Sequence, residues 1–67
     1  MSADEALARA EELLGQLEER RVALERLSDG GDLEGDAAVD LIAEIAELAR
    51  RIEGELARAR TIADASG

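Results

Sequence analysis

The sequence contains no cysteine, no histidine, no lysine and no aromatic residue. Without cysteine the chain has no disulfide and no thiolate metal ligand, and without histidine a metal site would have to consist of carboxylates alone. None of the serine and threonine hydroxyls can have a histidine, lysine or cysteine as its activating base. We therefore expect no catalytic residue, no metal site and no cofactor in this chain.

The charge is strongly of one sign. All eight basic residues are arginine, and the chain has 17 acidic residues, which gives a formal net charge of −9. An acidic chain repels the phosphates of nucleic acid, and the lack of aromatics removes stacking platforms for bases, so we expect no direct nucleic-acid binding. No apolar run approaches the roughly 20 residues that span a bilayer, and residues 1–10 show no signal-peptide pattern. We expect a cytoplasmic protein that does not bind membranes.

Two long stretches space their apolar residues by three and four, which fits one side of an α-helix and fits no strand. Ser2 followed by Glu5 has the pattern of a capping box at the start of the first helix. A run rich in glycine and aspartate separates the stretches, and either Asp32 or Asp36 is expected to cap the second helix. The predicted bounds are 3–27 for the first helix, 28–36 for the turn and 37–63 for the second helix, within one domain of residues 1–67.

The acidic turn also invites comparison with a calcium loop, because Asp32, Glu34 and Asp36 alternate as calcium ligands do. A twelve-residue calcium loop needs glycine at its sixth position and glutamate at its twelfth, where this chain has Ala37 and Ala43. The turn and the helix cap account for these residues instead.

The apolar positions define a seam in the first helix and a wider stripe in the second. A wide stripe suits two or more neighbours rather than one facing helix. Gly15 and Gly54 lie inside the helices, either on a solvent face or where another helix approaches closely. The predicted seam of the first helix is Leu7, Ala10, Leu14, Leu17 and Leu24, with Leu13 and Leu27 alongside; the stripe of the second is Leu41, Ile42, Ile45, Leu48, Ala49, Ile52 and Leu56.

Two helices of near-equal length with a short connection predict an all-α fold, an antiparallel two-helix hairpin of the coiled-coil type. A core this small is marginal by itself, and without disulfides its extra stability is expected to come from oligomeric partners. We therefore expect the hairpin to assemble into a helical bundle, with itself and with a larger helical protein subunit.

Several segments resemble the small subunit of exodeoxyribonuclease VII. Gly31 and Leu33 match the family's opening of the second helix, although Gly35 stands where the family usually has leucine. The register from Gly31 through Ala59 needs no gap, while the first helix is about two turns longer than the family's. The matching residues are Glu5-Ala6-Leu7-Ala8-Arg9 and Glu11-Glu12-Leu13 in the first helix, and Gly31-Asp32-Leu33, Ala38, Leu41, Leu48-Ala49-Arg50-Arg51 and Leu56 in the second half.

The resemblance implies a non-catalytic subunit. In that family the large subunit carries the nuclease chemistry and degrades single-stranded DNA to oligonucleotides, while the small subunits are helical hairpins that associate with each other and along the long helices of the large subunit. For every residue expected to bind a partner, the competing interpretation is a place in the core of the hairpin, and this interpretation is favoured for Ile45 and Ile52. The residues expected to bind a partner are Leu41, Ile45, Leu48, Ile52 and Leu56.

Two other functions remain open from the sequence. The first is a self-associating helical hairpin that forms a four-helix bundle and serves as an adaptor or scaffold, with no nuclease role. The second is an acidic inhibitor that occupies a basic nucleic-acid-binding surface, which the net charge of −9 suggests. The salt dependence of partner binding separates these two functions. Binding by an acidic inhibitor should weaken steeply in salt, whereas association through aliphatic residues should not.

Overall fold

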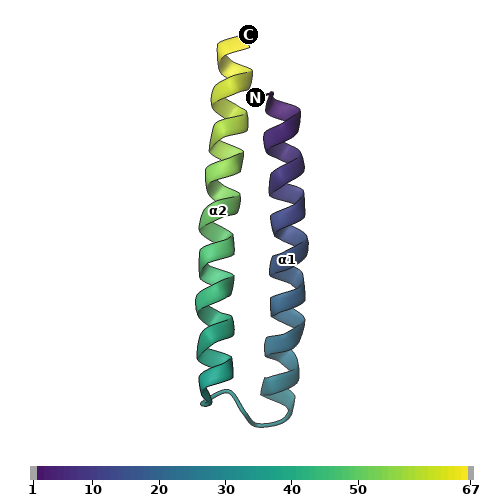
Figure 1. The fold of residues 1–67 in the computed structure, drawn as a ribbon, viewed down its shortest axis with the longest axis vertical. Helices are drawn as coiled ribbons and strands as arrows, with labels where there is room; N and C mark the ends of the chain where they lie inside the picture. The colour runs from purple at the N-terminus through teal and green to yellow at the C-terminus, as the bar shows by residue number, and fades with distance from the viewer. Residues whose placement is uncertain (1, 67) are drawn as a thin grey trace.

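Two antiparallel helices lie side by side along their whole length in the computed structural model, which describes residues 2–66 (Figure 1). Helix α1 spans Ala3–Asp29 and helix α2 spans Asp36–Ser66. The turn lies at one end of the hairpin, and the start of α1 and the end of α2 lie at the other. The predicted all-α hairpin is confirmed; Met1 and Gly67, which complete the predicted domain, lie outside the described residues.

The predicted cap of α1 is present, because Ser2 precedes the helix in extended conformation and its Oγ accepts a hydrogen bond of 3.1 Å from the Glu5 N–H. At the other end, Gly31 has a φ of +78°. Its N–H donates to the Ser28 carbonyl, and the next N–H, of Asp32, donates to the Leu27 carbonyl at 2.8 Å. These two bonds around a left-handed glycine form a Schellman motif, which ends the helix.

Helix α2 begins without a side-chain cap of the predicted kind. Asp36 is already the first helical residue, and Gly35 precedes it, with a carbonyl that accepts from the N–H groups of Ala38 and Val39. Neither Asp32 nor Asp36 therefore occupies the cap position. Glycine is tolerated there nearly as well as a capping side chain, and Asp36 in the first turn suits the positive end of the helix dipole.

The core between the helices is thin. Only two of its buried members are large aliphatics, so the hairpin hides little apolar surface per residue. Residues at seven-residue steps share a side of each helix, which is the pattern of coiled-coil packing. The buried apolar residues are Ala6, Ala10, Leu13, Ala38, Leu48 and Ala59.

Most of the predicted seam of α1 is confirmed, since Ala10 and Leu13 are buried and three further leucines are half-buried, namely Leu17, Leu24 and Leu27. Two predicted members lie on the surface instead. Leu7 and Leu14 are 42% and 50% exposed, while Ala6 and Leu13 are buried. The prediction followed the larger side chains, whereas packing against α2 buries the small Ala6 completely. The consequence is that two leucines predicted to be in the core of α1 remain on the surface.

Gly15 and Gly54 lie in helix interiors, and a Cβ built on either would meet no atom within 4 Å in the hairpin. We expect Gly15→Ala and Gly54→Ala each to raise the free energy of unfolding by about 1 kcal/mol, because alanine favours the helix. Gly31→Ala is the control: its left-handed φ should make the same change destabilising by about 1 kcal/mol. Thermal melts followed by circular dichroism measure the stability of all three variants. A loss of stability in Gly15→Ala or Gly54→Ala would show that the added methyl group does not point into open space.

Candidate protein-binding faces

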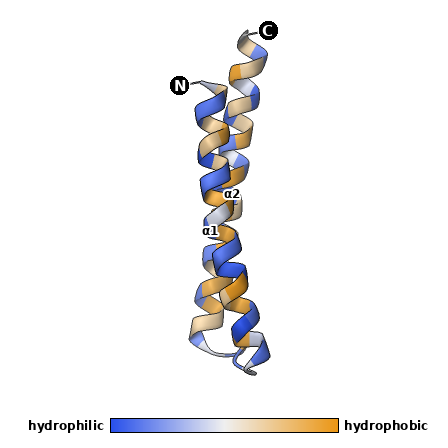
Figure 2. Ribbon diagram, turned by 90° about the vertical axis from the view of Figure 1, so that its right-hand side faces the viewer, coloured by the Kyte–Doolittle hydropathy of each residue, from blue (hydrophilic) through white to orange (hydrophobic). Residues whose placement is uncertain are grey.

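One side of the hairpin carries an open aliphatic surface, which we call the apolar face. It spans both helices away from the turn and continues toward the turn on α2 alone, because the α1 positions at seven-residue steps after Leu14 are Arg21 and Ser28. Its upper part is a shallow groove of about 280 Å³ between the helices, lined by side chains from both. Ile42 and Ala49 precede Leu56 by steps of seven, so they continue the same side of α2 toward the turn. The ribbon coloured by hydropathy shows apolar segments recurring along both helices (Figure 2). The groove is lined by Leu7, Ala10, Glu11, Leu14, Ile52 and Leu56.

The five predicted partner-binding residues fall into two groups in the structure. Some lie in the seam between the helices, and others line the apolar face. Leu48 is only 6% exposed, so most of its surface is already used against α1. Leu41, Ile45 and Ile52 are half-buried along the seam, and Ile52 also borders the groove. Leu56 is 47% exposed and lies in the groove. Ile52 and Leu56 are therefore the two predicted residues that line the apolar face.

Sequence reasoning omitted three members of this face from the predicted binding residues: Leu7, Leu14 and Ile42. All three are at least 42% exposed, and Ile42 reaches 53%. The signal was present, since 7 and 14, and 42 and 56, are separated by multiples of seven and lie beside the seam positions. They were assigned to the interhelical seam or stripe because size alone does not say which side of a wide stripe faces the second helix.

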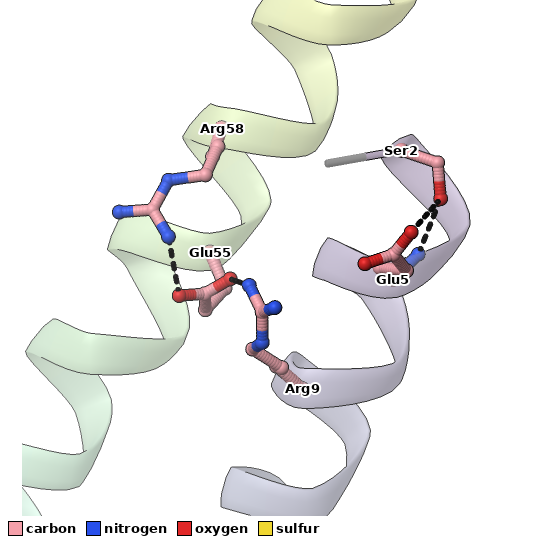
Figure 3. Close-up of polar contacts among 5 residues, drawn as sticks. All are labelled: Ser2, Glu5, Arg9, Glu55 and Arg58. Atoms are coloured by element: carbon pink, nitrogen blue, oxygen red, sulfur yellow. Dashed lines mark hydrogen bonds and ion pairs between the residues drawn. The ribbon is translucent and has the colours of Figure 1, made fainter.

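The opposite side, which we call the polar face, carries ion pairs between the helices. Arg20 Nε lies 3.3 Å from Glu44 Oε2 on the other helix. Arg9 Nη1 lies 3.8 Å from Glu55 Oε2, also across the two helices, and Arg58 donates a 2.9 Å hydrogen bond to Glu55 Oε1 within α2 (Figure 3). Positive and negative side chains are equal in number here, so this face is close to neutral. It is lined by Arg9, Glu12, Leu13, Gln16, Arg20, Ala43, Glu44, Glu47, Leu48, Arg51, Gly54, Glu55 and Arg58.

Glu55 occupies a position in the seam between the helices, although the apolar spacing of the sequence did not predict it there. It follows Leu41 and Leu48 at steps of seven, and its side chain is only 14% exposed. Its Oε2 is buried and has an ion-pair partner but no hydrogen bond. A buried carboxylate with an incomplete set of hydrogen bonds is destabilising compared with an aliphatic side chain of similar size.

We expect Glu55→Leu to stabilise the isolated hairpin by about 1 kcal/mol, because an aliphatic side chain would complete the seam without desolvating a charge. Denaturant unfolding of the wild-type chain and the variant gives the difference. Glu47→Leu is the matched control: its side chain is exposed on the same face, so its effect should stay within about 0.5 kcal/mol. A clear loss of stability in Glu55→Leu would mean that its pairs with Arg9 and Arg58 outweigh the desolvation.

Neither helix, over the residues described, is both long enough and apolar enough to cross a membrane. Within residues 2–66, no group of three or more carboxylates is placed to hold a metal ion.

Comparisons with known proteins identify no relative: no protein-family model, no curated protein and no solved structure matches the chain. The likeness to the exodeoxyribonuclease VII small subunit therefore rests on the sequence segments from Glu5 to Leu13 and from Gly31 to Ala59.

Proposed function

We propose that this chain is the non-catalytic small subunit of exodeoxyribonuclease VII and associates with the large subunit, which degrades single-stranded DNA to oligonucleotides. The observation that carries the docking role is the apolar face, on which Leu7, Leu14 and Leu56 are about half exposed. A hairpin with a thin core and one aliphatic side gains stability by covering that side. The resemblance in sequence supplies the identity of the partner.

The division of labour in this proposal follows from the side chains available. The chain has no histidine, cysteine or lysine, so bond cleavage belongs to the large subunit. A net charge of −9 makes this chain a poor surface for DNA. Its contribution is to bind and stabilise helices of the large subunit, and it acts on the substrate only through them.

Co-expression with an exodeoxyribonuclease VII large subunit tests the proposal. We expect the two chains to elute together from a sizing column and to remain associated in moderately high salt, because an aliphatic interface is little affected by screening. Elution as two separate species would contradict the proposal.

The thin core also favours a second function, a self-associating scaffold with no nuclease role. The molecule is a rod with extents of 51 by 14 by 13 Å, so a second hairpin could pack along its length as in a four-helix bundle. Sedimentation of the chain alone distinguishes the two functions. A stable dimer or tetramer that does not bind the large subunit would support the scaffold and exclude the subunit.

A further inference from the structure

The excess negative charge is distributed unevenly around the hairpin. The polar face is close to neutral, so the net charge of −9 resides elsewhere on the chain. Part of it forms a row along α1, because Asp4, Glu11, Glu18 and Glu25 follow one another at seven-residue steps and so share one side of the helix. All four residues of this acidic row are exposed.

The acidic row borders the apolar face. Glu11 lines the groove together with Leu7 and Leu14. Asp4 and Glu11 come three residues before Leu7 and Leu14 of the apolar face, while Glu18 and Glu25 come three residues before Arg21 and Ser28, the polar residues that follow on the same side of α1. Arg21 lies beside the row, with its guanidinium group 3.3 Å from a carboxylate oxygen of Glu18 and 3.5 Å from one of Glu25. One arginine does not balance four carboxylates, so the row keeps a net negative charge.

The edge contributed by α2 is different. Its corresponding row, at seven-residue steps beside Ile42 and Leu56, is Val39, Ala46, Glu53 and Arg60, which is neutral in sum. The apolar face is therefore flanked by an acidic edge on α1 and a neutral edge on α2.

These edges disfavour a second copy of the chain as the occupant of the apolar face. Face-to-face packing of two copies would place the acidic row either beside the same row of the partner or beside the neutral row of α2. The first arrangement is repulsive and the second supplies no complementary charge. In helical assemblies, charges that flank an apolar seam set the choice of partner and its orientation.

We propose that the apolar face binds one amphipathic helix of a different protein, with an aliphatic stripe over the groove and arginine or lysine at seven-residue intervals on the edge that lies over α1. This inference rests on the proposed function in one respect, that the chain acts by docking to a helical partner. It does not depend on that partner being a nuclease subunit.

Two synthetic helical peptides with the same leucine stripe test the proposal, one with arginine and one with glutamate along a single edge. Titration of a fluorescently labelled peptide with the intact chain, at moderate salt, gives each affinity. We expect the arginine-edge peptide to bind roughly a hundredfold more tightly, since several charge pairs change from attractive to repulsive. Equal affinities, or self-association of the chain that excludes both peptides, would overturn the proposal.

Two matched double variants test whether the acidic row causes the preference for the arginine-edge peptide. Glu11→Gln with Glu18→Gln removes two charges of the acidic row and should reduce the preference about tenfold. Glu12→Gln with Glu19→Gln removes the same net charge from the next residues along α1, which lie toward the other side, and should leave it within about twofold. An equal loss in both pairs would mean unspecific attraction to an acidic chain.

The same variants separate this inference from the proposed nuclease role. If the large subunit binds the wild-type chain and the Glu11/Glu18 variant equally well, the inference fails while the nuclease role stands. If the peptides show the expected preference but the large subunit does not bind, the nuclease role fails and the inference stands.

Discussion

Replacing Leu48 with alanine is expected to remove most of the stability of the isolated hairpin. Leu48 is 6% exposed and, among the residues that the structure describes, is one of two large aliphatic side chains buried between the helices. Truncation of a buried leucine destabilises a protein by about 3 kcal/mol, and a chain of this size has only about 3–5 kcal/mol of stability from its core. The helical circular dichroism signal should therefore fall sharply.

Val39→Ala serves as the control for Leu48→Ala, because Val39 is in the same helix and is 58% exposed. Its effect on the free energy of unfolding should stay within about 0.5 kcal/mol. Equal thermal melting of the two variants would show that the helices do not pack through the Leu48 seam.

The second large effect concerns binding. Leu14→Asp combined with Leu56→Asp should weaken the complex with the partner at least about a hundredfold, because two carboxylates would be buried in an aliphatic interface. Both leucines are about half exposed in the hairpin, so the helical signal of the isolated variant should be largely retained. Calorimetric titration with the large subunit measures the change in affinity.

Val22→Asp is the matched control for the binding variant. Val22 is 44% exposed on α1, among Glu18, Glu19 and Arg26 rather than in the groove. Its substitution should leave the affinity nearly unchanged. Full retention of binding by the Leu14/Leu56 variant would move the interface away from the apolar face.

The fold could be predicted from the sequence because its local and global signals agree. The three-and-four spacing marked two helices, Ser2 and Glu5 marked the start of the first, and the glycines marked the turn. The second seam was also largely found, since Leu41, Ile45, Leu48 and Ile52 are large aliphatics at seam positions.

The apolar face, which is the candidate site, could be predicted only in part, for two physical reasons. In α1 the small Ala6 is fully buried, and such a side chain gives little signal beside Leu7. In α2 the seam includes Glu55, a charge that the apolar spacing passes over. Both errors concern which side of a helix meets its neighbour, a property set by the partner helix rather than by the helix itself.

Amide hydrogen exchange of the isolated chain at low concentration, repeated after addition of the large subunit, tests most directly the claim that the hairpin is completed by a partner. We predict that the slowest amides of the lone chain report an opening free energy of about 3 kcal/mol or less, and that binding slows exchange in both helices. A lone monomer whose slowest amides report more than about 5 kcal/mol, unchanged by the large subunit, would contradict the account.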